Sequence, residues 1–161
     1  MQAGGKAVPG TKAKFRLEPD ITPGEIKIPA ELQRMLRQSK QLQKFYDSLN
    51  FSMRRYIALL VGEGKHAETR RRRGEQIAEW MMETMEAERE LPPLIQLALQ
   101  RNPKARTGWE LMSRTHRRSH LLGIFYSRNP ESRARRLAKA VEEMIAYAEK
   151  RATERKSMLD E

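Results

Sequence analysis

The sequence predicts an all-α protein, built as two tandem four-helix modules that pack as a pseudo-symmetric helical bundle. Two observations lead to this fold class: an internal repeat without gaps, and helix start signals that recur at the same offset in both copies. An apolar content of 39% supplies a core, and a charged content of 33% suits helices with solvated outer faces. We expect one exception to the helices, a short strand at about residues 25–28.

The repeat appears when the chain is shifted by 63 residues. Residues 28–82 then align with residues 91–145 without a gap, and 12 of the 55 aligned pairs are identical. Two helical stretches matched by composition alone would share only a few identities, so the alignment indicates a duplicated module. The chain therefore divides into a flexible N-terminal arm (1–27), a first module (28–85), a second module (91–148) and a helical or frayed tail (149–161).

Helix start signals stand at matched positions in the two copies. Pro29 and Pro92 suit the first turn of a helix, where a proline sacrifices no hydrogen bond. Residues that can cap a helix stand ahead of the later helices in matched pairs, namely Ser39 with Asn102, Asn50 with Ser113, and His66 with Asn129. We expect helices from about residues 29, 40, 51 and 67, with the last ending near 85, and the same pattern from 92 to about 150.

The last helix of each module carries a stripe of apolar residues with helical spacing. In the second copy the stripe consists of Ala134, Leu137, Ala138, Val141, Met144, Ile145 and Ala148. In the first copy it consists of Gly74, Ile77, Ala78, Met81, Met82 and Met85. One module of this size buries too little surface to be comfortably stable alone, so we expect the two modules to pack against each other.

Positive charge is the feature with functional content. The chain carries a net charge of +11, with +4 in the first module and +7 in the second. Arginines gather at helix starts, where the helix dipole is already positive, so either carboxylates or an external anion must balance them. The first interpretation is a set of structural ion pairs among Arg54, Arg55, Glu68, Arg117, Arg118 and Glu131. The second is an anion-binding surface made of Arg70, Arg72, Arg73, Arg133, Arg135 and Arg136.

Within these groups we expect two different roles. Arg133 and Arg136, in the first turns of the last helix, should face the anion. Arg117 should be more buried and clamped by a carboxylate, with Glu68 and Glu131 pairing to arginines of the third helices.

Several of these residues form a recurring motif. In the second copy it reads Met112-Ser113, then His116-Arg117-Arg118, then Pro130-Glu131-Ser132-Arg133-Ala134-Arg135-Arg136-Leu137. The first copy offers Leu49, Ser52, Arg54-Arg55, Glu68-Thr69-Arg70 and Arg72-Arg73. With these motifs both modules resemble the bacterial YdeI or OmpD-associated (OmdA-like) family, often labelled bacteriocin-protection proteins. The family tends to place a glutamate after the Arg-Arg pair, where this chain has Tyr56 and Ser119.

The sequence offers no recognisable catalytic constellation. It has no cysteine, Gly-rich phosphate loop or Gly-x-Ser-x-Gly motif, so we expect no enzyme and no cofactor. His116 and His120 stand one helical turn apart, but no carboxylate lies between them, and we expect no metal.

The expected function is that of a non-enzymatic interaction module, with an acidic protein or a polyanion as its partner. The alternative is a nucleic-acid binder that contacts the phosphate backbone without reading sequence, which the pI of about 10.3 favours. No segment is apolar enough to span a membrane and no export signal is recognisable, so we expect a cytoplasmic protein; the oligomeric state stays open.

Overall fold

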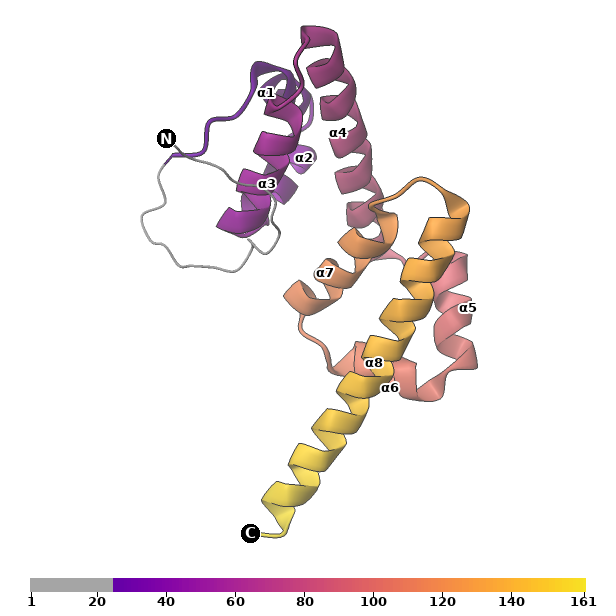
Figure 1. The fold of residues 1–161 in the computed structure, drawn as a ribbon. Coiled ribbons are helices and arrows are strands. Elements are labelled where there is room, and N and C mark those ends of the chain that lie inside the picture. Colours follow the sequence, from indigo (N-terminus) through magenta and orange to yellow (C-terminus); the bar gives the residue numbers. More distant parts are fainter. Residues whose placement is uncertain (1–24) are drawn as a thin grey trace. The chain divides into compact units, whose positions relative to one another are not determined.

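A computed structural model describes residues 25–161, and in that range every regular element is an α-helix (Figure 1). The helices are α1 (Ala30–Arg37), α2 (Lys40–Ser48), α3 (Phe51–Gly62), α4 (Ala67–Arg89), α5 (Pro93–Arg101), α6 (Pro103–Leu111), α7 (Arg114–Phe125) and α8 (Pro130–Leu159). The predicted all-α class is confirmed. The predicted strand is wrong, because residues 25–29 belong to neither helix nor strand; the rest of the arm, residues 1–24, lies outside the described residues.

The helix bounds reproduce the repeat. The bounds of α2 and α6 differ by the same 63 residues at both ends, and so do those of α3 and α7. The starts of α1 and α5, and of α4 and α8, have this spacing too. Pro29 and Pro92 occupy the N-cap, one position earlier than expected, with nearly equal backbone angles (φ −57°, ψ 147° and φ −59°, ψ 153°). The tandem arrangement is therefore confirmed.

Most of the predicted caps are made by side chains. Ser39, Asn50 and Ser113 each accept a hydrogen bond from the backbone N–H three residues later, and Asn129 accepts from both Glu131 and Ser132. Asn102 differs. Its side-chain amide donates to the carbonyl oxygen of Ala98 at 2.7 Å, because Asn102 also ends α5 and satisfies a carbonyl there.

The chain divides into two compact units, residues 1–81 and 82–161, so α4 begins in unit 1 and ends in unit 2. In unit 1, α1 contacts both α2 and α3. The buried apolar side chains are Leu32 and Leu36 from α1, Leu42, Phe45 and Tyr46 from α2, Leu49 just after it, Ile57, Ala58 and Val61 from α3, and Ile77, Ala78, Trp80 and Met81 from α4. Gly74 of α4 lies against α1, since a Cβ there would be 3.4 Å from the carbonyl oxygen of Glu31.

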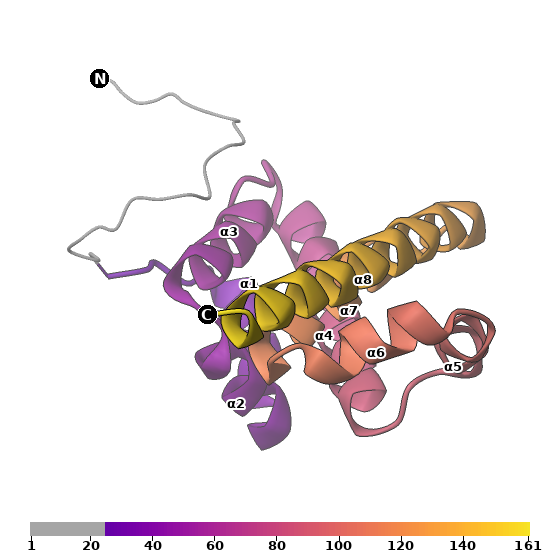
Figure 2. The ribbon, with the colours of Figure 1, turned by 90° about the horizontal axis from the view of Figure 1, so that it is seen from below.

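In unit 2, α8 packs against α6 and α7, and Figure 2 shows α8 passing over α6. Gly108 is the point of closest approach: a Cβ added there would lie 1.9 Å from the carbonyl oxygen of Met144. The buried side chains of α8 are Ala140, Met144 and Ala148, one turn apart from each other.

The predicted stripes are thus right at their centres and wrong at one edge. Ala134 and Ala138 are exposed, whereas Ala140, which was not predicted, is buried. The backbone contact at Gly108 sets which side of α8 faces the core, and the apolar spacing does not show that contact. In the first copy, Met82 is 47% exposed. Among the described helices, none has a stretch long and apolar enough to cross a membrane.

Candidate functional site

The arginines at the starts of the third helices hold the ends of the second helices. Arg54 donates from Nε to the carbonyl oxygen of Leu49 at 3.1 Å. Arg117 donates to the carbonyl oxygens of Trp109 and Glu110 at 2.8 and 3.0 Å, and its guanidinium lies 5.4 Å from the centre of the Trp109 ring. We expected a carboxylate at Arg117. Carbonyls take its place because a helix end leaves them without intrahelical partners and with partial negative charge.

Arg55 and Arg118 are equivalent in sequence but differ in their surroundings. Arg118 forms a two-point ion pair with Glu88, with 2.5 Å from Nε to Oε2 and 3.0 Å from Nη2 to Oε1. The two side chains are only 15% and 14% exposed. Glu88 comes from the last turn of α4 and belongs to unit 2. Arg55 is exposed and makes no ion pair within the described part of the chain.

Arg70 and Arg133 bond equivalent backbone carbonyls in the two copies, but they pair with different carboxylates. Both donate to the carbonyl of the same loop position, from Nη1 of Arg70 to Gly64 at 2.9 Å and from Nε of Arg133 to Ser127 at 2.5 Å. Each arginine therefore fastens the loop that precedes its long helix.

The carboxylates come from different places. Glu31 of α1 pairs with Nε of Arg70 at 3.1 Å, whereas Glu83 of α4 pairs with both Nη atoms of Arg133 at 3.0 and 2.8 Å. A hydrogen bond from its own backbone, and then Arg70, lower the pKa of the Glu31 carboxyl against the opposing effect of burial. We expected Arg133 to face an external anion. In the structure both Nη atoms of its guanidinium bond the Glu83 carboxylate instead.

Arg73 and Arg136 also have equivalent partners. Arg73 donates to the carbonyl oxygen of Leu60 at 2.9 Å, and Arg136 to that of Gly123 at 3.1 Å. Leu60 and Gly123 are 63 residues apart and lie near the ends of α3 and α7. The Arg136 guanidinium also lies over the Tyr126 ring, 5.3 Å from its centre. These two arginines tie the third helix to the fourth in each copy.

Arg72 and Arg135 are the candidate anion-binding residues that bond no backbone carbonyl and no carboxylate among the described residues. Both are exposed, and Arg135 makes only a contact from Nη2 to the Ser132 hydroxyl at 3.1 Å. Each lies between two arginines whose guanidinium groups bond backbone carbonyls. Arg71 and Arg136 are exposed as well, but Arg71 pairs with Glu68 and Glu75, and Arg136 bonds the Gly123 carbonyl. At the positive end of each long helix, Arg72 or Arg135 is therefore the exposed arginine that has neither a carboxylate nor a backbone carbonyl among the described residues.

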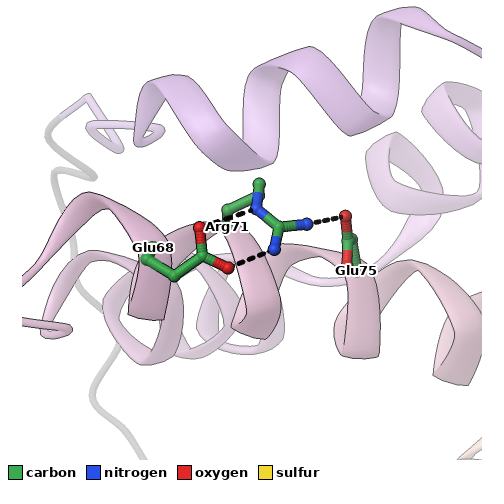
Figure 3. A network of polar contacts seen from close by, with 3 residues as sticks. All are labelled: Glu68, Arg71 and Glu75. Carbon is green, nitrogen blue, oxygen red and sulfur yellow. Dashed lines mark hydrogen bonds and ion pairs between the residues drawn. The ribbon is translucent and has the colours of Figure 1, made fainter.

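Glu68 pairs within its own helix rather than with a third-helix arginine. Figure 3 shows Arg71 between Glu68 and Glu75 on α4, with a two-point contact to Glu68 and a 2.5 Å contact from Nη1 to Glu75. Hydrogen bonds from Arg71, and then its charge, lower the pKa of the Glu68 carboxyl. Glu131 is exposed, and no described arginine pairs with it. Ala134 and Ala138 stand where Arg71 and Glu75 stand in the first copy.

His116 and His120 form a stacked pair with neighbours from α8. Their ring centres are 5.2 Å apart, and the His116 ring meets Tyr147 edge-on at 5.0 Å. Nδ1 of His120 lies 3.6 Å from Oε1 of Glu143. Burial lowers the pKa of His120, Glu143 opposes this, and His116 adds to it. Within residues 25–161 no group of three histidine, aspartate or glutamate side chains is placed to hold a metal ion.

Comparison with known proteins agrees with the motif. The model of the bacteriocin-protection, YdeI or OmpD-associated family matches twice, at residues 25–84 and 88–146. This chain belongs to that family. The two matches lie end to end and correspond to the two copies of the repeat. No curated protein and no solved structure matches the chain.

Three partners of the arginines were missed from the sequence. Glu31, Glu83 and Glu88 supply the carboxylates, and none was predicted to do so. One signal comes from the family matches, which begin at the equivalent residues Glu25 and Glu88 and so place Glu88 at the start of a module rather than in a linker. The backbone carbonyls that accept from these arginines could not be predicted from residue types, since every residue has a carbonyl.

Proposed function

We propose that this family member is a non-enzymatic interaction module that binds an acidic protein partner through Arg72 and Arg135. One observation carries the proposal. At the start of each long helix, two arginines bond backbone carbonyls, and one exposed arginine between them, Arg72 or Arg135, has no carboxylate or carbonyl partner among the described residues. The same division of roles occurs in both copies.

This arrangement suits a carboxylate-bearing partner. A guanidinium can bind a carboxylate with two parallel hydrogen bonds, and the helix dipole adds positive potential at the same point. The bonded neighbours fix the backbone from which the exposed arginine projects, so less conformational freedom is lost on binding than in a mobile loop. The net charge of +11 adds a general attraction for acidic molecules.

Nucleic acid is the second candidate, favoured by the pI of about 10.3. Single-stranded nucleic acid is usually held by stacking bases on exposed aromatic rings. Tyr126 is the exposed aromatic side chain nearest these arginines in sequence, at 44% exposure, and its ring already carries the Arg136 guanidinium. Duplex binding through phosphates alone stays compatible with the charge.

The test compares two probes and two double variants. Fluorescently labelled polyglutamate and a labelled duplex DNA of arbitrary sequence are titrated with the full chain at two salt concentrations. The variant Arg72→Glu with Arg135→Glu should weaken polyglutamate binding by about tenfold or more, equivalent to about 1.4 kcal/mol. The control variant, Lys40→Glu with Arg114→Glu, makes the same change in net charge at the exposed first residues of α2 and α7.

Equal losses in the two double variants would show that net charge alone drives binding, and the proposed site would fail. A duplex that binds more tightly than polyglutamate, with affinity falling steeply as salt rises, would instead establish the nucleic-acid function.

A further inference from the structure

Unit 1 has an exposed surface on α3 that mixes charge and apolar character. Arg55 and Leu59 lie one turn apart on the same side of the helix, and Leu59 is 43% exposed. Ser52, one turn before Arg55, is exposed as well. We refer to Ser52, Arg55 and Leu59 as the α3 face. It is separate from the long-helix starts of the proposed function.

In unit 2 two of the equivalent positions are paired or buried. Arg118 and Leu122 are the equivalents of Arg55 and Leu59, and Leu122 is only 5% exposed. The last turns of α4 supply Glu88 to Arg118 and Glu83 to Arg133, and Arg133 lies over the Phe125 ring of α7 at 5.2 Å. The end of α4 is thus an acidic helical segment whose glutamates pair with Arg118 of α7 and Arg133 of α8.

Among the described residues of unit 1, no acidic segment pairs with Arg55 as the end of α4 pairs with Arg118. Glu25, the equivalent of Glu88, is exposed and forms no ion pair with any residue from 25 to 161, and Arg70 takes its carboxylate from Glu31 of α1 instead. Arg118 is paired with a carboxylate in unit 2, whereas its equivalent Arg55 has no carboxylate partner among the described residues of unit 1.

We propose that the α3 face is the docking site for an acidic amphipathic helix of a partner protein, which pairs with Arg55 as Glu88 of α4 pairs with Arg118 and covers Leu59. The partner supplies a carboxylate to Arg55 and an apolar side chain to Leu59. The α4 template also specifies small side chains beside the carboxylates, because Thr84 and Ala87 between Glu83 and Glu88 are 0% and 2% exposed.

Charge argues against a second copy of this chain as the occupant. The part of α8 equivalent to the end of α4 has Arg151 at the position of Glu88 and Ala146 at the position of Glu83. Docking that segment on the α3 face would place Arg151 beside Arg55, and like charges at this distance repel. An acidic partner removes that conflict.

The experiment uses the chain's own template as a probe. A labelled synthetic peptide with the sequence of residues 79–90 is titrated with the full chain and followed by fluorescence anisotropy. The peptide should bind, and Arg55→Glu should lower its affinity by about tenfold or more. A peptide carrying Glu88→Arg should regain affinity for the Arg55→Glu protein, because the charges are then exchanged. Leu59→Ser should weaken binding by a smaller factor.

Two control variants locate the site. Arg34→Glu makes the same charge change on an exposed residue of α1 and should leave peptide affinity unchanged. The double variant Arg72→Glu with Arg135→Glu removes the proposed site for acidic partners and should weaken peptide binding by a smaller factor than Arg55→Glu does. If that double variant abolishes peptide binding while Arg55→Glu does not, docking on α3 is wrong and the proposed function stands.

Other occupants give different results, and each would overturn the assignment to a partner. A rise in peptide affinity after removal of residues 1–24 would show that the chain's own N-terminal segment competes for the face. A change in oligomeric state in Arg55→Glu, measured by sedimentation, would show a second copy there. Absence of peptide binding, or equal loss in Arg34→Glu and Arg55→Glu, would show that no such site exists.

Discussion

The two copies share the backbone partners of their arginines but not the carboxylates. Arg54 and Arg117, Arg70 and Arg133, and Arg73 and Arg136 all bond carbonyls of the second helix end, the loop or the third helix end. The carboxylates come from α1 in unit 1 and from the end of α4 in unit 2. Contacts to the backbone survive sequence divergence because a substitution leaves the carbonyl in place, whereas a carboxylate is lost with its side chain.

A second difference lies in the glycines. Gly108 of the second copy stands where the first has Phe45, and Leu137 of the second stands where the first has Gly74. The second copy brings α6 and α8 together at Gly108, whereas Gly74 lies close to α1 in the first. At these glycines the long helix lies against a different neighbour in each copy, α1 in the first and α6 in the second.

The largest effect is expected from exchanging these glycines. Gly108→Phe, which installs the residue of the first copy, should destabilise the protein by about 3 kcal/mol or more, because even a Cβ would overlap the Met144 carbonyl. Phe45→Gly should cost about 3–5 kcal/mol through the cavity it leaves. Urea denaturation followed by circular dichroism measures both.

Gly123→Ala is the matched control, since nothing lies within 4 Å of the added Cβ in α7. It should be neutral or stabilising by up to about 1 kcal/mol, the difference in helix propensity. If Gly108→Phe were equally harmless, the close contact of α6 with α8 would be wrong.

A smaller loss of stability is expected from replacing Arg118, which is paired with a carboxylate, than from exchanging the glycines, and a smaller one still from replacing its equivalent Arg55. Arg118→Ala should lower the free energy of unfolding by about 2–3 kcal/mol, because it leaves the Glu88 carboxylate buried without its partner. Arg55→Ala should change it by less than about 0.5 kcal/mol, as an exposed side chain does. Similar losses from the two variants, in the same denaturation assay, would contradict the described difference between the copies.

The arginines with shared backbone partners should behave alike. Arg54→Ala and Arg117→Ala should each cost about 1–2 kcal/mol, the value of hydrogen bonds from a charged donor to helix-end carbonyls. Glu110→Gln serves as a control, because Arg117 bonds the Glu110 backbone and this change keeps it. A loss in Glu110→Gln as large as in Arg117→Ala would point to a carboxylate partner after all.

The smallest expected effect is a dependence of stability on pH that arises at His120 and that its first-copy equivalent, Ile57, cannot produce. Because burial lowers the pKa of His120 in the folded state, the unfolded chain binds the proton more tightly. Its contribution to stability is complete above the unfolded pKa of about 6.5 and falls as pH drops through the lowered folded pKa. His116 adds to the decline and Glu143 reduces it.

Melting temperatures between neutral and mildly acidic pH test this effect. The variant His120→Ile should show a shallower decline than the parent chain. Replacing the exposed His66 with glutamine should leave the decline as it is. An unchanged slope in His120→Ile would mean that the imidazole is solvated in the folded protein.

The sequence predicts features that depend on neighbours along the chain. Helix starts were placed within one residue because caps such as Asn50 and Ser113 act on the next three residues. The side-chain cap predicted at Asn102 is not formed, because this residue ends α5 as well as beginning α6. The side of α8 that faces the core was misjudged at Ala134 and Ala138, because the decisive contact at Gly108 is distant in sequence.

The candidate site was predictable only in part for the same reason. Arginine clusters are visible in the sequence, but their acceptors are backbone carbonyls, which any residue provides. The bonded and exposed arginines therefore look alike until the loops are placed. The repeat does predict the burial of Ala140, because Ala140 is the equivalent of Ile77, a member of the predicted buried stripe of the first copy.

The course of α4 through both units has a consequence for when each arginine is occupied. Arg118 receives Glu88 from a segment of the same chain, and a tethered group acts at an effective concentration on the order of millimolar or higher. Arg55 has no tethered counterpart in the described residues, so under the docking proposal its carboxylate arrives from solution and its occupancy follows the amount of partner. One copy would then be permanently saturated, and the other would respond to concentration.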